Sequence, residues 1–422
     1  MTPPVGRREF LKRMAVALPV SEVLSRYHAL AAPAMKQVKI TDVKVMLVHG
    51  LFDWPMVKIE TDAGITGIGE SYWGRGVKDI MLGNLRPLLI GEDPLDVDRL
   101  YTKMVSRTGG SGSAAGTTVT AISGMEIALW DTAGKILGVP VCKLLGGQYR
   151  KAVRAYWTQH PNNMLDKSSC RDFADMLKQH PYGFRGIKVD YNPRTQDPAD
   201  PFSRRWSAKD IRANVAGFNN IREAVGDDIE IAFHCHWEFD EIDALTLARA
   251  IEPMKPAWLE DPMPPDYSPA WPQLTASSPV PILTGENLYT RQGFRPFIVN
   301  QGVNIVQIDI PKAGGLLEAR KISDLAELYY IPTNAHNVAS PIGTLASAHS
   351  AASMRDFRGH EFNVGHTGGR ASFWENWEKF AIYDRPFFKE GNIQLSDKPG
   401  LGVELNEDYV RGHLAPGEEW WG

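Results

Sequence analysis

Seven short apolar runs in the second half of the chain each end in a polar residue, and these residues recur at a nearly constant spacing. They are Lys188, His234, Glu260, Glu286, Asp309, His336 and Glu361, with successive differences of 46, 26, 26, 23, 27 and 25 residues. One βα unit of an eightfold barrel takes roughly 25–30 residues, and the long first step contains the loop YNPRTQDPADPFSRRWS. The spacing predicts an α/β barrel, with VRAYWTQH as its first strand and these side chains at its C-terminal rim, where barrel enzymes keep their chemistry.

The chain before the barrel has a different pattern of apolar residues. KITDVKVMLVHG and PMVKIETDAGITGIGESYW are typical of antiparallel strands. DPLDVDRLYTKMV and TAISGMEIALWDTAGKILGV are typical of helices, and the glycine-rich RTGGSGSAAGTT separates them. These patterns predict a separate α+β unit ahead of the barrel.

Composition narrows the classes of function. A net charge of −4 gives no electrostatic reason to expect nucleic acid or an anionic membrane as a partner. Three cysteines without a CxxC pair indicate neither a disulfide framework nor a thiolate zinc site. No apolar stretch approaches the roughly 18 residues that span a bilayer.

The first 35 residues resemble a twin-arginine export signal. Arg7 and Arg8 precede a short apolar segment, and ALAAPA supplies small residues near a cleavage point. We therefore expect export to the periplasm, and set residues 1–35 apart from the fold. The alternative is an amphipathic leader helix on a cytoplasmic protein, since Ser21, Glu22 and Arg26 interrupt the apolar part.

Three of the rim residues come from consecutive predicted strands and form a candidate metal site. His234, Glu260 and Glu286 would point at one spot, and two carboxylates with open positions suit Mg²⁺ or Mn²⁺. The alternative for each glutamate is a salt-bridged strand end. A divalent cation there would stabilise the enediolate formed when a proton alpha to a carboxylate is removed.

The other rim residues are candidates for proton transfer. His336 is the expected base, with Asp309 on the preceding strand orienting its imidazole. Lys188 would neutralise the substrate carboxylate or act as a second acid or base, and Glu361 would hydrogen-bond the substrate or intermediate. His236, which strand alternation places on the same face as His234, would protonate a leaving hydroxyl.

From residue 38 onward the chain resembles the mandelate racemase/muconate lactonizing enzyme group of the enolase superfamily. The resemblance is carried by GITGIGESYW, AISGMEIALWDTAGKILGVPVCKLLGG, WLEDP, TGENLYTRQGF, DIPKAGGLLEARKISDLAELYYIPTNAH and PGLGVELNEDYV. It implies an α/β fold with a modified TIM (β/α)7β barrel, residues 151–385. An α+β capping domain, residues 36–150, would close over it, with residues 386–422 returning to the cap. It further implies one Mg²⁺ ion, proton abstraction alpha to a carboxylate, and assembly as a homo-oligomer.

Within that group the chain is most similar to the galactonate and mannonate (acid-sugar) dehydratases, and it departs from their pattern twice. Their third barrel strand ends in Asp-x-His, the Asp binding metal and the His serving as acid. Counting 26 residues back from Glu260 puts His234 on the Asp position and His236 on the acid. A competing register, which needs a two-residue insertion, puts Ala232 there and makes His234 the acid. A histidine ligand weakens the preference for Mg²⁺ and favours Mn²⁺ or Zn²⁺.

The second departure is on the preceding strand, where the racemase Lys-x-Lys is replaced by Lys188-Val189-Asp190. Loss of the second base favours one-base elimination. We therefore expect a metal-dependent lyase that dehydrates a sugar acid or related polyhydroxy carboxylate. The alternatives are an epimerase or cycloisomerase on a related carboxylate or lactone, and a non-catalytic homologue.

Substrate selection is expected to fall to loops at the mouth of the barrel. The candidates are Trp73 and Arg75, the segment from Arg107 to Thr117, and three arginines of the second-strand loop, Arg194, Arg204 and Arg205. Arginine forks suit a carboxylate or polyol, although these side chains are equally consistent with solvated surface charges.

Overall fold

A computed structural model describes residues 37–109, 114–190, 207–363 and 377–421. The predicted export signal lies outside these residues. So do Arg194, Arg204 and Arg205, and the middle of the segment from Arg107 to Thr117. The proposals for those parts of the chain therefore stay predictions.

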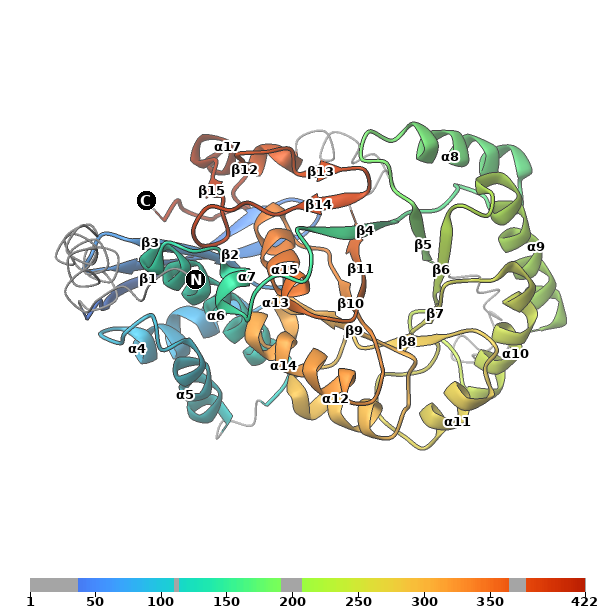
Figure 1. The fold of residues 1–422 in the computed structure, drawn as a ribbon, viewed down its shortest axis with the longest axis horizontal. Helices are drawn as coiled ribbons and strands as arrows, with labels where there is room; N and C mark the ends of the chain where they lie inside the picture. The colour runs from blue at the N-terminus through green and yellow to red at the C-terminus, as the bar shows by residue number, and fades with distance from the viewer. Residues whose placement is uncertain (1–36, 110–113, 191–206, 364–376, 422) are drawn as a thin grey trace, which may run out of the picture.

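Eight parallel strands close into a barrel, seen on the right of Figure 1. The last strand pairs with the first, with His360 opposite Ala155. The strands are β4 (Ala152–Thr158), β5 (Gly186–Asp190), β6 (Glu230–His234), β7 (Leu259–Glu260), β8 (Ile282–Thr284), β9 (Ile305–Asp309), β10 (Thr333–His336) and β11 (Phe357–Phe362). The prediction of a barrel with its first strand in VRAYWTQH is confirmed.

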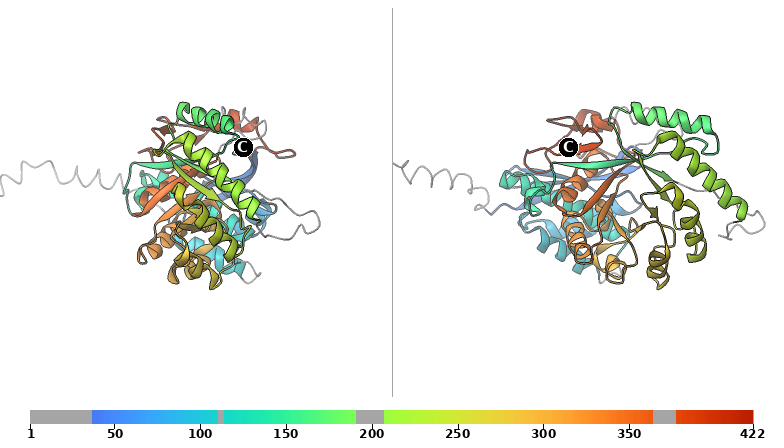
Figure 2. Two further views of the ribbon diagram at one scale, coloured as in Figure 1. Left: turned by 90° about the vertical axis from the view of Figure 1, so that its right-hand side faces the viewer. Right: turned by 45° about the vertical axis from the view of Figure 1, so that its right-hand side comes forward.

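Helices follow the first seven strands and cover the outside of the barrel. Figure 2, which turns the barrel toward the viewer, shows the green and yellow-green helices lying outside the strands. They are α8 (Lys167–Gln179), α9 (Ala208–Val225), α10 (Glu241–Ile251), α11 (Ala270–Ser277), α12 (Thr290–Val299), the short α13 (Ile310–Ala313) with α14 (Leu316–Glu327), and α15 (Pro341–Ser353). After β11 the next described element is the 3-10 helix η3 (Trp377–Phe380), so the described chain has the (β/α)7β arrangement that we expected.

The N-terminal part forms a three-stranded antiparallel sheet with helices against it. Its elements are β1 (Ile40–His49), β2 (Asp53–Thr61), β3 (Thr66–Glu70), α3 (Val77–Ile80), the π-helix η1 (Met81–Leu85), α4 (Arg86–Leu89), α5 (Val97–Gly109), α6 (Thr117–Leu137) and α7 (Val141–Leu144). Glycine lets β3 lie directly on α6. A Cβ on Gly69 would come within 2.6 Å of the Gly124 carbonyl oxygen, and one on Gly67 within 2.1 Å of Thr132 Oγ1.

The C-terminal segment runs back from the barrel to this sheet. Its elements are β12 (Ala381–Ile382), β13 (Phe388–Lys389), β14 (Asn392–Gln394), β15 (Glu404–Leu405) and α17 (Glu407–Arg411). β14 pairs antiparallel with β4, with Ile393 opposite Val153. Further along, Glu418 Oε2 accepts a 2.6 Å hydrogen bond from the backbone N–H of Leu47 in β1. The segment therefore contacts both parts, as the resemblance implied, while the domain limits that we expected stay predictions.

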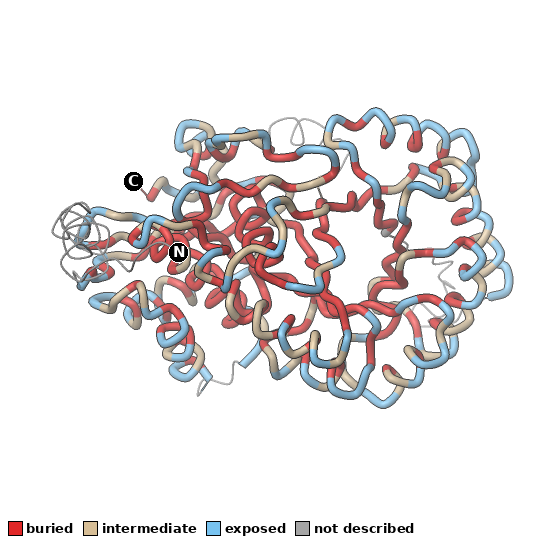
Figure 3. Tube along the Cα trace, viewed as in Figure 1, coloured by how far each residue is buried: buried red, intermediate tan, exposed pale blue. Residues whose placement is uncertain are grey.

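An apolar cluster lies inside the barrel, on the N-terminal side of the polar rim. Side chains from five places around the barrel pack together: Tyr156, Ala232, Trp258, Leu283 and Ile305. Figure 3 shows the barrel strands as buried and the outer sides of the helices as exposed. The polar side chains of the barrel interior described next lie beyond this cluster, at the C-terminal ends of the strands. In the described part of the chain no helix is long and apolar enough to cross a membrane.

Candidate active site

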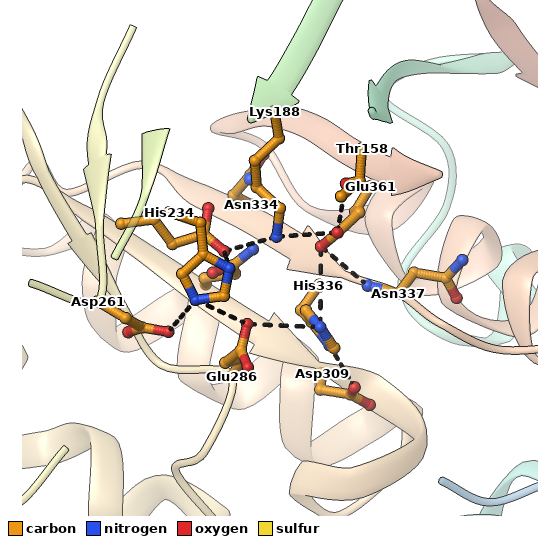
Figure 4. A network of polar contacts seen from close by, with 12 residues as sticks. Thr158, Lys188, His234, Asp261, Glu286, Asp309, Asn334, His336, Asn337 and Glu361 are labelled. Carbon is orange, nitrogen blue, oxygen red and sulfur yellow. Dashed lines mark hydrogen bonds and ion pairs between the residues drawn. The ribbon is translucent and has the colours of Figure 1, made fainter. Parts of the chain in front are cut away.

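The seven regularly spaced polar residues all lie at or just beyond the C-terminal ends of barrel strands. Each is at most 6% exposed, and Figure 4 shows most of them converging on one spot inside the rim. Glu286 lies two residues past β8, and the other six lie within their strands. The structure therefore brings these side chains together as the strand spacing predicted, while their assignment to an active site and the role of each residue stay predictions.

Four side chains form a group with the composition of a divalent cation site. His234, Glu260, Asp261 and Glu286 each offer one ligand atom, and these atoms lie within 4.8 Å of one another. Oδ2 of Asp261 and Oε2 of Glu286 are buried and accept no hydrogen bond from the described residues. Buried carboxylate oxygens without a donor are costly unless a cation takes that place. The donor set and its burial therefore fit a divalent metal ion.

The pairing of β6 with its neighbours bears on the two alternative registers. His234 lies opposite Glu260 in the ladder, whereas Ala232 lies opposite Lys188 and packs in the apolar filling of the barrel. His234 Nε2 is 3.3 Å from Asp261 Oδ2 and 3.8 Å from Glu286 Oε2. This geometry favours the register that makes His234, not Ala232, the candidate metal ligand.

His336 and Asp309 form a hydrogen-bonded pair on adjacent strands. His336 Nδ1 is 2.6 Å from Asp309 Oδ2, and His336 Nε2 is 3.4 Å from Glu286 Oε2 and 3.9 Å from Glu361 Oε2. Burial lowers the pKa of His336, but Glu286, Glu361 and the Asp309 hydrogen bond outweigh it and raise the pKa to about 9. Asp309 thus fixes the ring so that Nε2 faces the other carboxylates (Figure 4).

Lys188 lies between two buried carboxylates on opposite sides of the rim. Its Nζ is 2.7 Å from Glu260 Oε1 and 2.8 Å from Glu361 Oε1. Burial raises the pKa of Glu260, but Lys188 and His234 more than offset this, so the pKa lies well below its usual range. Trp258 Nε1 donates to the other oxygen, Oε2, of Glu260 at 2.9 Å. Glu260 is therefore held charged and in a fixed orientation.

Glu361 has partners on β4 and β5 and one just beyond the end of β10. Its Oε1 accepts a hydrogen bond from the Thr158 hydroxyl as well as from Lys188. The backbone N–H of Asn337 approaches its Oε2 at 3.4 Å. The strand spacing does not point to Thr158 or Asn337.

The expectation that His234 and His236 share a strand face needs a correction. β6 ends at His234, and His236 follows in a left-handed conformation with φ of 51°. The two rings nevertheless stack, with centroids 3.7 Å apart and an interplanar angle of 19°. A turn and not strand alternation brings them together, and His236 is more exposed than His234.

The N-terminal part adds aromatic residues beside His336. Tyr72 follows β3, and its ring centroid is 6.3 Å from that of His336. The ring of the neighbouring Trp73, a candidate for substrate selection, stacks on that of Phe52 with centroids 4.5 Å apart, and Trp73 is 40% exposed. Arg75 is exposed. Tyr72 and Asp261 are thus site residues that the sequence did not reveal.

Comparison with known proteins agrees with this geometry. Residues 171–409 match the family "Enolase C-terminal domain-like", and residues 48–146 match "Mandelate racemase / muconate lactonizing enzyme, N-terminal domain". The chain belongs to the enolase superfamily. Its place in the mandelate racemase/muconate lactonizing enzyme group, which the sequence motifs predicted, is confirmed.

Named relatives of this superfamily member narrow the class further. It is 38% identical over 384 residues to D-xylonate dehydratase of Haloferax volcanii, covering 91% of each chain. It is 31% identical to D-galactonate dehydratase of Pectobacterium atrosepticum, over 87% of this chain and 92% of the relative. A mandelate racemase/muconate lactonizing enzyme-like protein from Rubrobacter xylanophilus superposes with a TM-score of 0.83 at 36% identity, covering 92% of this chain and all of that one. The superfamily member is therefore an enzyme of the hydro-lyase type, similar to the acid-sugar dehydratases.

Proposed function

We propose that this enzyme dehydrates a sugar acid, an aldonate or a closely related polyhydroxy carboxylate, in a metal-dependent reaction. The observation that carries the proposal is the arrangement of a buried His–Asp pair across from a buried carboxylate and imidazole cluster. Relatives named D-xylonate and D-galactonate dehydratase support the substrate class.

His234, Glu260 and Glu286 would hold the divalent cation. Mg²⁺ follows from the family resemblance, and Mn²⁺ or Zn²⁺ from the histidine. When bound, the cation would supply positive charge that holds the substrate carboxylate, stabilises the enediolate and offsets the Glu286 charge that raises the pKa of His336.

His336 is the group that we assign to the alpha proton. Its Nε2 faces the carboxylate cluster, because Nδ1 is bound to Asp309 at 2.6 Å. Asp309 keeps the ring in the tautomer whose Nε2 lone pair accepts the proton, and it stabilises the imidazolium that results.

The remaining residues have supporting roles in the proposal. Lys188 and Glu361 are joined at 2.8 Å and would place hydrogen-bond donors and acceptors beside the substrate carboxylate and hydroxyls. His236, stacked on His234, would deliver a proton to the departing hydroxyl. Tyr72 would restrict water access to His336 from the side of the capping part.

The experiment is a screen of aldonic and aldaric acids with Mg²⁺, Mn²⁺ and Zn²⁺ in parallel, scored for 2-keto-3-deoxy acid formation. We expect at least one aldonate to be dehydrated, and no turnover after chelation. An epimer or a cyclised product in place of the keto acid would assign the enzyme to the alternative chemistry. Metal binding without turnover of any acid would contradict dehydration and favour a non-catalytic homologue.

We also propose that residues 1–35 direct export to the periplasm. The support is the paired Arg7 and Arg8 ahead of a short apolar segment. Fractionation of cells expressing the full chain tests this, with replacement of both arginines by lysine as the matched variant. We expect the unaltered chain in the periplasm and the variant in the cytoplasm. A cytoplasmic location of both proteins would contradict export.

A further inference from the structure

Asp261 places a further carboxylate in the cluster of His234, Glu260 and Glu286, although strand alternation predicts that it points away from them. The residue is fully buried, and its Oδ2 lies 3.3 Å from His234 Nε2. That oxygen accepts no hydrogen bond from the described residues, whereas Oδ1 is bound by the Thr284 hydroxyl. Thr284 thus anchors one oxygen, and Figure 4 shows Asp261 joined to His234 by a dashed line.

The backbone explains how two consecutive residues reach the same site. Asp261 follows Glu260 directly, and strand alternation would turn its side chain to the opposite face of the barrel. Its φ of 44° breaks that alternation. Its N–H donates to the Leu283 carbonyl at 2.9 Å, and its own carbonyl accepts from the Trp237 N–H at 2.7 Å. Contacts to both neighbouring strand ends therefore hold the unusual conformation.

The charge of Asp261 would strengthen cation binding. His234 would contribute a neutral imidazole to the cluster. Glu260 and Glu286 would provide two negative charges, and Asp261 would raise the total to three. A hard divalent cation is bound more tightly as more anionic oxygens surround it.

We propose that Asp261 is a fourth metal ligand, beside His234, Glu260 and Glu286. The proposal rests on the metal dependence contained in the proposed function. The resulting site has one imidazole and three carboxylates, a donor set suited to Mn²⁺ or another borderline ion more than to Mg²⁺.

Metal affinity without substrate provides the test, so that its outcome is independent of turnover. Calorimetric titration of chelator-treated protein with Mn²⁺ should show Asp261→Asn binding at least about tenfold more weakly than the unaltered chain. Asp266→Asn, which removes an exposed carboxylate five residues further along, is the matched control and should bind normally. Equal affinity of the Asp261→Asn and control proteins would overturn the proposal.

A double substitution separates a ligand from a residue that only orients His234. In a His234→Ala background, Asp261→Asn should cause a further loss of at least about tenfold in Mn²⁺ affinity. No further loss would show that Asp261 acts through the histidine and would overturn its assignment as a ligand. Should the double variant fold poorly, the d–d absorption of Co²⁺ in the single Asp261→Asn variant serves instead. A spectrum unchanged from the unaltered protein would overturn the proposal equally.

Discussion

Glu126 Oε2 accepts a 2.8 Å hydrogen bond from the backbone N–H of Leu316, which lies 190 residues further along the chain. Glu126 is on α6 of the capping part, and Leu316 begins α14 of the barrel. Oε1 accepts from the next N–H, that of Leu317, at 3.0 Å. A buried carboxylate from one part of the molecule therefore satisfies the orphan N–H groups at a helix start in the other.

Gly315 is the residue whose substitution should disrupt this contact most directly. It has φ 91° and ψ −166°, a region open almost only to glycine, and a Cβ there would lie 2.2 Å from Glu126 Oε2. We expect Gly315→Ala to lower the free energy of unfolding by well over the 1–3 kcal/mol or so that backbone strain alone costs. Gly226→Ala is the matched control, because Gly226 has φ 82° and ψ −178° with nothing within 4 Å of its Cβ position. Equal losses in urea unfolding would show that the contact with Glu126 is unimportant.

Asp309→Asn should reduce kcat strongly and leave KM little changed. An amide can keep the 2.6 Å contact to His336 Nδ1 but favours the wrong tautomer and no longer stabilises the imidazolium. The expected loss in kcat is on the order of 10²- to 10⁴-fold. Exchange of the substrate alpha proton in D₂O should slow in parallel.

The His336→Asn variant is the reference for this experiment. It should lose exchange altogether, and Asp309→Asn should add little to it, because the two residues act as one unit. Alpha-proton exchange that survives in His336→Asn would mean that another group takes the proton.

Most of what could be predicted about the fold and the site comes from two sequence features. These are the alternation of side chains along a strand and the length of one βα unit. Because parallel strands end at one rim, polar residues spaced 23–27 positions apart, after a first step of 46, are enough to predict that these side chains lie close together. The pair of Asp309 and His336 follows from the same logic, since neighbouring strands place their ends side by side.

What the sequence did not reveal depends on single backbone conformations and on contacts between distant segments. Asp261 and His236 both follow a strand end and both have positive φ, which no period in the sequence records. Tyr72 reaches His336 only because the capping part folds against the barrel, and 264 positions separate the two residues in the chain. Local patterns cannot report such contacts.

Lys188→Met should destabilise the protein at neutral pH by several kcal/mol. The substitution leaves the carboxylates of Glu260 and Glu361, each at most 1% exposed, without the ammonium that bridges them. Breaking a buried pair by removing one partner costs roughly 3–5 kcal/mol. Urea unfolding at pH 7 in the presence of chelator measures the change.

Two further variants make the Lys188 result interpretable. Lys167→Met removes an ion pair of similar length, 2.8 Å to Glu223, but both partners are more than 60% exposed, so it should cost less than about 1 kcal/mol. Adding Glu361→Gln to Lys188→Met should recover part of the stability, because one uncompensated charge disappears. A Lys188→Met protein as stable as Lys167→Met would refute the importance of the bridge.

His349 should make the protein less stable as the pH falls from about 6.5 to about 4. It lies fully buried in α15, where Nδ1 accepts from the Cys142 N–H at 3.3 Å and Nε2 donates to the Leu401 carbonyl at 3.1 Å. Burial lowers its pKa from 6.5 to about 4, against a small opposing effect of the Leu401 hydrogen bond. Between these values the unfolded chain binds a proton that the folded chain does not, so the free energy of unfolding rises with pH by up to about 1.4 kcal/mol per pH unit.

The difference between the unaltered chain and His349→Gln isolates this contribution. Glu126 acts in the opposite direction, because burial raises its pKa to about 7 and the folded state holds the extra proton between pH 4.5 and 7. That contribution is common to both proteins and cancels. As the pH falls from 6.5 to 4, we therefore expect the free energy of unfolding of the unaltered chain to fall relative to that of His349→Gln. Urea unfolding of both proteins at each pH measures this difference. A difference that is constant over this range would mean that His349 titrates alike in the folded and unfolded chains, and that its burial between α7 and the C-terminal segment is not maintained in solution.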